Sequence, residues 1–131
     1  MTETIRLRAC VAVAHDGRIL LVPHANSDAC NIQWNLPGEQ VAFGERLQET
    51  AVREAAEETG LAVRITGLLD VSEVIIPERP WHGVTVAFRG ELAAESGHRY
   101  GEKAPRWFSP GELVGVACHP WESIDEGLWE G

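Results

Sequence analysis

The segment at residues 45–61 constrains this chain most, because it places several carboxylates on one short helix. Arg53 is followed by Glu54, Glu57 and Glu58 within six residues. On a helix that advances by about 100° per residue, Glu57 lies about 60° behind Glu54 and Glu58 about 40° ahead, so the three share an arc of roughly 100°. Like charges at this spacing repel one another and destabilise a bare helix. A bound divalent cation is the strongest candidate for the compensating charge.

The flanks of this segment predict that the acidic helix docks on a sheet. Leu47, Ala51 and Ala55 recur at four-residue spacing and form a narrow apolar stripe. We expect the helix at about residues 46–59, with Gly60 just past its end, where a left-handed residue is favoured. The alternative for the glutamates is a plain solvated face. A calcium loop does not fit, because the Asp-rich loop sequence with its closing glutamate is missing.

Apolar runs on both sides of this helix predict strands. Residues 7–14 and 19–22 should form a hairpin around Asp16-Gly17, a dipeptide favoured in two-residue turns. Further strands are expected near Val41 and at residues 63–76 (bent or broken at Gly67), 83–92 and 106–108. Loops are expected at residues 23–33, 77–80 and 93–104. This order of elements favours an α/β sandwich, in which helices cover a mixed sheet.

Two more helices are expected near the end of the chain. Ser109-Pro110-Gly111-Glu112 is a capping box with proline at the first helical position, and it predicts a brief helix through Val114. After Pro120, apolar residues recur at helical spacing and predict a terminal amphipathic helix, namely Trp121, Ile124 and Leu128.

Length and charge restrict the class of protein. With 131 residues, we expect a single domain over residues 1–131. A net charge of −9 argues against a surface that binds a nucleic-acid polymer, which would carry clustered Lys and Arg. The N-terminus lacks a signal-peptide pattern, and no apolar run is long enough to span a membrane, so we expect a cytoplasmic protein without a membrane partner. The three cysteines have no metal-ligand spacing and are expected to be reduced thiols: Cys10, Cys30 and Cys118.

The stretch at residues 34–61, WNLPGEQVAFGERLQETAVREAAEETGL, resembles a Nudix box, the signature of hydrolases that act on nucleoside diphosphates linked to another moiety. That pattern is Gly, five residues, Glu, seven residues, Arg-Glu, an aliphatic residue, any residue, Glu-Glu, any residue, Gly and an aliphatic residue. Eight of its nine fixed positions are in register here: Glu45, Arg53, Glu54, Ala55, Glu57, Glu58, Gly60 and Leu61. The opening glycine is replaced by Glu39, although Gly38 just before it is kept.

The resemblance implies a Nudix-type α/β/α sandwich with a mixed β-sheet flanked by helices. It also implies divalent-metal-dependent hydrolysis of a phosphoric anhydride bond, with water attacking phosphorus. The substrate would be a nucleoside triphosphate or a nucleotide sugar such as ADP-ribose. The cofactor would be Mg²⁺, with Mn²⁺ as an alternative, because carboxylate-bound Mg²⁺ keeps positions open for water and phosphate oxygens.

By the same resemblance, the metal is assigned to Glu54, Glu57, Glu58 and the backbone carbonyl of Gly38. Arg53 is expected to orient Glu45 and its neighbours, because guanidinium and carboxylate pair in a fixed bidentate geometry. The alternative for that pair is a plain surface ion pair.

Two glutamates outside the core of the pattern leave alternatives open. Glu102 is the candidate base or further ligand before the strand at residues 106–108, and an ordinary loop acid is its alternative. Glu39 could restrict close approach of the backbone to metal or phosphate, add a ligand, or point to solvent. We expect that glutamate at position 39 alters the properties of the site without abolishing activity.

Substrate recognition is the least constrained feature. Trp34 and Trp81 fall in or beside expected loops, where an indole can stack on a nucleobase, although core packing is the commoner fate of a tryptophan. Arg79 could reach a terminal phosphate. The chain has no glycine-rich nucleotide loop, so recognition would rest on metal and scattered side chains. The alternative function is a catalytically silent Nudix domain that senses a nucleotide. We expect a monomer or a homodimer.

Overall fold

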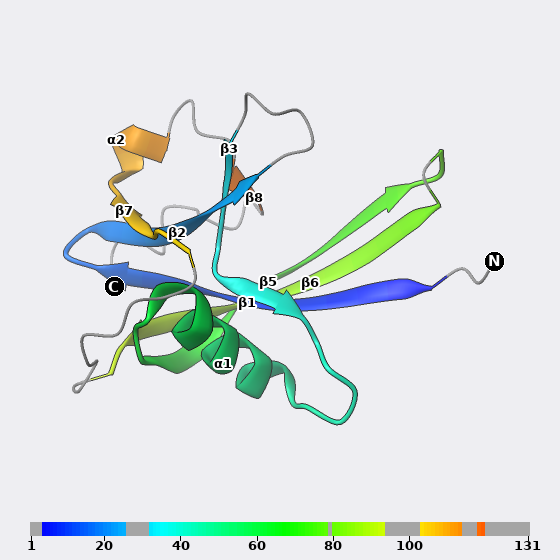
Figure 1. Ribbon diagram of the computed structural model, residues 1–131, viewed down its shortest axis with the longest axis horizontal. Helices are drawn as coiled ribbons and strands as arrows, with labels where there is room; N and C mark the ends of the chain where they lie inside the picture. Colours follow the sequence, from blue (N-terminus) through cyan, green and yellow to red (C-terminus); the bar gives the residue numbers. More distant parts are fainter. Residues whose placement is uncertain (1–3, 26–31, 79, 94–102, 114–117, 120–131) are drawn as a thin grey trace.

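The computed structural model describes residues 4–25, 32–78, 80–93, 103–113 and 118–119. Within them, eight strands form one sheet in the order β5-β6-β1-β2-β3-β8, with β4 paired to β1 and β7 paired to β2 (Figure 1). The elements are β1 (Ile5–His15), β2 (Arg18–Ala25), β3 (Ile32–Asn35), β4 (Gly38–Gln40), α1 (Leu47–Thr59), β5 (Val63–Ile76), β6 (Trp81–Leu92), β7 (Arg106–Phe108), α2 (Pro110–Leu113) and β8 (Cys118–His119).

The sheet is mixed, as the order of elements predicts. Strand β1 runs parallel to β6 and antiparallel to β2 and β4. The β1–β2 hairpin turns at Asp16 and Gly17, whose φ angles of 51° and 73° are both positive. Two positive φ values are typical of the two-residue turn that matches the twist of the strands, which confirms the expected Asp-Gly turn.

The long strand β5 is bent, also as expected. It pairs antiparallel with β6 over nearly its whole length, but the register shifts between Ile65 and Gly67 and again between Leu68 and Asp70. Irregularities of this kind increase twist locally and let one long strand serve two regions of a sheet. The outer ends of β5 and β6, together with the start of β1, project beyond α1 in Figure 1.

Strand β1 lies at the centre of the core and feeds both faces of the sheet. Cys10 and Ala12 point to one face, with Leu21 and Phe108 among their buried neighbours. On the opposite face, Ala9, Val11 and Val13 of β1 pack against α1. The helix contributes Ala51 and Ala55 to this part of the core. Because Ala51 and Ala55 are fully buried, the apolar stripe predicted for the helix is confirmed.

The segment at residues 23–33 is strand at both of its ends, where the sequence predicted a loop. Strand β2 continues to Ala25 and pairs with β3, which begins at Ile32, so the expected loop is wrong at both flanks. Cross-strand pairing with β3 supplies the hydrogen-bond partners that this polar sequence lacks locally. The short strand expected near Val41 ends one residue earlier, at Gln40.

Near the end of the described chain, the capping box is confirmed. The Ser109 backbone N–H donates to Glu112 Oε1 at 2.9 Å, and the Glu112 N–H donates to Ser109 Oγ at 3.4 Å. Cys10 is a buried, unpaired thiol, and burial raises its pKa to about 11. The helix expected after Pro120 lies outside the described residues. In the described part of the chain, neither helix has the length and apolar character needed to span a bilayer.

Candidate active site

Helix α1 carries Glu54, Glu57 and Glu58, and its Ala51 and Ala55 pack in the core with residues of β1. It ends at Gly60, which has a φ of 77° and donates its N–H to the Ala56 carbonyl at 2.9 Å. This left-handed cap confirms the predicted role of Gly60. Glu58 is seven residues after Ala51, which is nearly two full turns, so it lies on the same buried stripe as the alanines.

Glu58 is therefore a carboxylate inside the core, with an exposed fraction of only 2%. Its Oε1 accepts a hydrogen bond from the Gly38 backbone N–H at 3.2 Å. Its Oε2 is buried and has no hydrogen-bond partner among the described residues. Buried carboxylate oxygens are costly unless hydrogen bonds or positive charge compensate them.

Gly38 makes this arrangement possible because its backbone lies directly against β1. A Cβ atom at this position would stand 2.2 Å from the Ala9 carbonyl oxygen and 2.5 Å from Cys10 Cα. Both are backbone atoms that cannot move aside, so glycine is required for the close approach. The Gly38 carbonyl, which the sequence assigned to metal, accepts a 3.3 Å hydrogen bond from Arg8 Nη2.

Three carboxylates meet in front of this backbone. Glu39 of β4 joins Glu54 and Glu58 of α1, and one ligand oxygen from each lies within 4.8 Å of the others. We call these three residues the carboxylate cluster. Glu39 is exposed, Glu54 half-buried and Glu58 buried, so the cluster opens to solvent on one side. The structure places the Glu39 side chain beside Glu54 and Glu58, which favours the alternative that Glu39 adds a ligand.

Lys103, which the sequence did not single out, brings positive charge to the inner carboxylate of the cluster, Glu58. Lys103 Nζ lies 3.6 Å from Glu58 Oε2, close enough for an ion pair but beyond hydrogen-bond distance. The Lys103 backbone N–H donates to the Glu58 carbonyl at 3.0 Å, which holds Lys103 beside the end of α1. Neither a motif nor a periodic pattern marks this lysine, because the contact joins residues 45 positions apart.

A second group of charges lies on the outer side of α1. Arg53 donates to both oxygens of Glu45, from Nε at 2.8 Å and from Nη2 at 3.0 Å. Its Nη1 reaches Glu54 at 2.7 Å and Glu57 at 3.1 Å. Thr50 Oγ1 donates to Glu45 Oε1 at 2.6 Å. We call Glu45, Thr50, Arg53 and Glu57 the Arg53 network, and its bidentate pair has the geometry expected from the sequence.

The two groups shift carboxylate pKa values in opposite directions. Burial raises the pKa of Glu58, although Lys103 and the Gly38 N–H oppose the shift. Burial likewise raises the pKa of Glu54 against its hydrogen bond from Arg53. In the Arg53 network, hydrogen bonds from Arg53 and Thr50 lower the pKa of Glu45 to about 2. The cluster thus holds carboxylates whose negative charge is under-compensated.

The carboxylate cluster fits a divalent cation because it offers oxygen ligands and because its negative charge is under-compensated. It offers oxygen ligands from three side chains, which hard cations prefer. Its innermost oxygen, Glu58 Oε2, has no hydrogen-bond donor within the described part of the chain. Like-charged carboxylates at this separation repel unless a cation lies between them.

The remaining predicted site residues are placed differently. Glu57 shares the helix with Glu54 and Glu58 but is exposed, and it is held by Arg53 outside the carboxylate cluster. Its assignment to metal stays a prediction. Glu102 and Arg79 lie outside the described residues, so their assignments stay predictions as well.

The two tryptophans proposed to bind substrate, Trp34 and Trp81, both lie in strands. Trp34 is in β3, not in a loop, and packs edge-on against Phe108 with ring centroids 5.1 Å apart. Trp81 begins β6 and lies under the Arg6 guanidinium, 4.1 Å from its ring centroid. His82 pairs with Ile5 whereas Glu39 pairs with Ala9, so Trp81 is at least roughly 13 Å from Glu39 along the strands. Stacking of a base on either indole stays a prediction.

Comparison with known proteins identifies the family. The sequence model of the NUDIX domain matches residues 4–128 of this chain. An RNA pyrophosphohydrolase from Brucella anthropi is 26% identical over 129 residues, which cover 90% of this chain and 69% of that protein.

Solved structures agree in fold. A MutT NUDIX hydrolase from Burkholderia pseudomallei is 30% identical, with a TM-score of 0.69 over 85% of this chain and 88% of that chain. A NUDIX hydrolase from Nitrosomonas europaea has a TM-score of 0.78 at 18% identity, over 92% of this chain and 84% of that chain. The chain therefore belongs to the NUDIX family and is a Nudix hydrolase.

Proposed function

We propose that this chain hydrolyses a phosphoric anhydride bond in a nucleoside diphosphate-linked substrate and depends on Mg²⁺ or Mn²⁺. The observation that carries the proposal is the carboxylate cluster: three ligand oxygens lie within 4.8 Å of one another, and the innermost, on Glu58, has no donor among the described residues. The family match over residues 4–128 supports the view that the chain is one such domain.

The cluster residues would hold the metal. Glu39, Glu54 and Glu58 would supply carboxylate ligands, because their oxygens lie close together, and Glu57 and the Gly38 carbonyl are further candidates. When bound, the metal neutralises charge on the substrate's phosphate oxygens and favours deprotonation of the attacking water. The Arg53 network holds Glu54 from the side by the 2.7 Å bond from Arg53 Nη1, which fixes one ligand in place.

The chain's own groups supply the acid–base chemistry. Water oxygen bonds to phosphorus, the bridging P–O bond breaks, and the leaving phosphate keeps the bonding electron pair. The proton leaves the water for a carboxylate. One of the glutamates of the acidic helix, Glu54, Glu57 or Glu58, is a candidate acceptor, because a carboxylate within reach of the proton can act as a general base. Glu102 is the other candidate acceptor.

The substrate class is open between triphosphates and nucleotide sugars. The relative from Brucella anthropi is an RNA pyrophosphohydrolase, which adds RNA as a further candidate substrate. Against an RNA substrate stands the net charge of −9, because a polyanion is repelled by an acidic surface.

A phosphate-release assay with Mg²⁺ or Mn²⁺ and a coupling pyrophosphatase or phosphatase tests the proposal. The panel holds nucleoside triphosphates and their oxidised forms, ADP-ribose, other nucleotide sugars, dinucleoside polyphosphates and a 5′-triphosphorylated RNA. Metal-dependent turnover of one class, absent with EDTA, is the expected result. Nucleotide binding without turnover of any compound would instead favour the silent sensing domain.

A further inference from the structure

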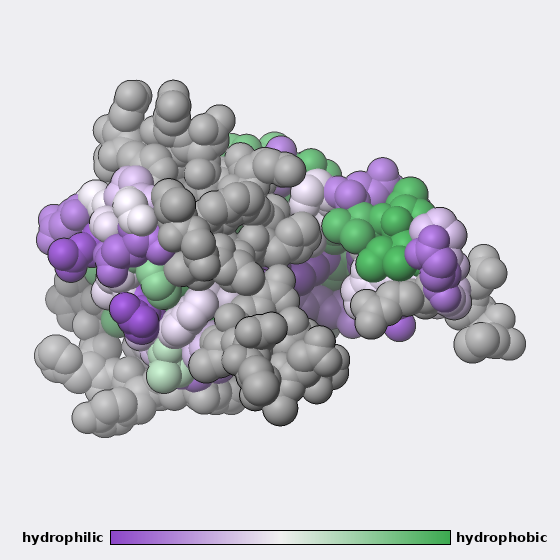
Figure 2. Space-filling model, turned by 90° about the horizontal axis from the view of Figure 1, so that it is seen from above, coloured by the Kyte–Doolittle hydropathy of each residue, from purple (hydrophilic) through white to green (hydrophobic). Residues whose placement is uncertain are grey.

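One face of the projecting arm is apolar and exposed. Figure 1 shows the start of β1 and the outer ends of β5 and β6 extending past α1, and Figure 2 shows apolar side chains gathered on this arm. The exposed residues are Ile5 (64%), Leu7 (37%), Leu68 (61%), Val71 (55%) and Ile75 (58%). We call these five residues the apolar strip.

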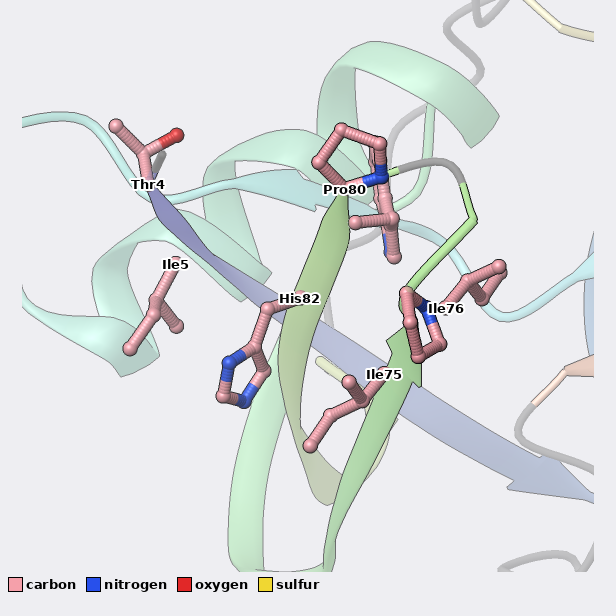
Figure 3. Close-up of a pocket in the computed structure, with 8 residues that line it drawn as sticks. Thr4, Ile5, Ile75, Ile76, Pro80 and His82 are labelled. Atoms are coloured by element: carbon pink, nitrogen blue, oxygen red, sulfur yellow. The ribbon is translucent and has the colours of Figure 1, made fainter. Parts of the chain in front are cut away.

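The strand register shows that the strip lies on one face. Cross-strand partners point to the same side of a sheet, and Ile5 pairs with His82, which pairs with Ile75. Two residues farther along, Leu7 pairs with Val84. Figure 3 shows Ile5, His82 and Ile75 on three adjacent strands around the cavity at the arm's end, which has a volume of about 450 Å³.

The same face is buried against α1 farther along the sheet. The next partners in register are Ala9 with Val86 and Val11 with Phe88, and all four belong to the core beneath α1. On β5, Val71 pairs with Val86 and Leu68 with Phe88, so the strip continues this core outward along the edge strand. Helix α1 therefore covers one part of an apolar face and leaves the other part open.

We propose that a second copy of this chain packs on the apolar strip, across a two-fold axis, to form a homodimer. The five side chains expose on the order of 500 Å² of apolar surface, which is at the upper end for the largest patch on a monomer. Packing strip on strip buries about twice that area from these side chains alone, which reaches the lower limit for a specific protein interface.

Charge also favours a second copy. The chain carries a net charge of −9, so most of its surface repels another copy. Among the described residues that share the face of the strip on the arm, Glu73 is the one carboxylate, and its Oε2 lies 2.6 Å from His82 Nε2. An isologous contact places the same patch on both partners, so apolar side chains meet apolar side chains and no complementary charge is needed.

The edge position of β5 supports the same contact. Strand β5 is at one end of the sheet, and β6 is its partner among the described strands. A long edge strand with exposed apolar side chains is a site of association unless it is covered. A second copy on the strip covers these side chains.

Light scattering coupled to size exclusion, over about 10 to 500 µM protein, tests the proposal on the full chain. We expect twice the monomer mass of 14.4 kDa for the wild type. Ile75→Glu and Val71→Glu each place a charge in the strip and should raise the dimer dissociation constant at least about 100-fold. Thr66→Glu is the matched control, because it adds the same charge at an exposed position of β5 outside the strip, and it should behave as the wild type does.

A wild type that stays monomeric over this range overturns the proposal, and so does a dimer that survives both strip substitutions. Circular dichroism checks that each variant is folded. Concentration-dependent hydrogen exchange of the wild type provides a test without substitutions: protection should rise in β5 and at the start of β1, and unchanged protection there overturns the proposal. Neither measurement depends on a substrate or on catalytic activity.

Discussion

The two sides of helix α1 use the same kind of side chain for opposite purposes. On the outer side, Glu45 is satisfied by Arg53 and Thr50, and its pKa falls to about 2. On the inner side, Glu58 is buried with one oxygen lacking a hydrogen-bond donor among the described residues, and its pKa is raised. The outer network stabilises the fold. The inner cluster keeps negative charge under-compensated, which costs stability and is the charge that a bound cation would offset.

The sharpest way to break this comparison is Glu58→Gln. The substitution keeps the shape and an oxygen for the Gly38 N–H but removes the charge that a cation needs. Turnover should fall by more than about 100-fold, because loss of a ligand exceeds the loss typical of an outer-shell partner. The assay is turnover on the substrate identified by the screen, together with Mn²⁺ binding.

Glu49→Gln serves as the control for that variant, because Glu49 is an exposed glutamate of the same helix. It should keep near wild-type turnover. Normal turnover in Glu58→Gln would refute the assignment of Glu58 to metal.

Lys103→Met tests how far the lysine ammonium compensates the charge of Glu58 in the inner cluster. The ammonium lies 3.6 Å from Glu58 Oε2 and competes electrostatically with a metal for the same carboxylate. Its removal should tighten Mn²⁺ binding about 10-fold, measured by electron paramagnetic resonance of free Mn²⁺. Lys103→Arg, which retains the charge, should stay close to wild type. Weaker Mn²⁺ binding in Lys103→Met would show that the lysine supports the metal site.

The dependence of stability on pH should have opposite signs on the two sides of the helix. Because the folded pKa of Glu58 is raised above 4.5, its contribution to stability is present below pH 4.5 and is lost as the pH rises through the folded pKa. Glu58→Gln should therefore be more stable than wild type at neutral pH without metal. This difference should vanish below about pH 4.5.

For Glu45, whose folded pKa is lowered to about 2, stability is present above pH 4.5 and is lost as the pH falls toward 2. Glu45→Gln should therefore be less stable than wild type at neutral pH. Thermal melts in EDTA across this pH range measure both differences. Two differences of the same sign would contradict the contrast between the two sides.

The smallest effect is expected from Thr50→Val. Thr50 is fully buried and its hydroxyl donates the 2.6 Å bond to Glu45, so its loss should cost about 1–2 kcal/mol in the free energy of unfolding. Urea denaturation measures this change. Thr66→Val, at an exposed position, should change stability by less than about 0.5 kcal/mol. Equal effects at both positions would show that the hydrogen bond from Thr50 to Glu45 does not contribute to stability.

Much of the fold followed from local patterns in the sequence. The Asp16-Gly17 turn, the long strand β5 with its irregularity near Gly67, and helix α1 with its Gly60 cap were all predicted, because each depends on residues close in sequence. The ends of the expected loop at residues 23–33 were not, since pairing between β2 and β3 is a contact that no short window contains.

The candidate site divides along the same line. Glutamate spacing on one helix brought Glu54 and Glu58 together in the prediction, because helix geometry alone fixes their separation. Glu39 and Lys103 come from distant parts of the chain, and only the fold places them beside Glu58. Glu57 shares the predicted arc, yet the fold turns it toward Arg53.

By itself, the sequence determined the acidic helix, its cap, the stripe that docks it and the membership of a hydrolase family. All of these are encoded by spacing within a few turns or by a contiguous motif. The tertiary structure decided that Glu58 is the buried glutamate, that Lys103 lies beside it, and which part of the apolar sheet face stays exposed. Burial and charge compensation depend on what packs opposite a residue, and that partner is chosen by the fold as a whole.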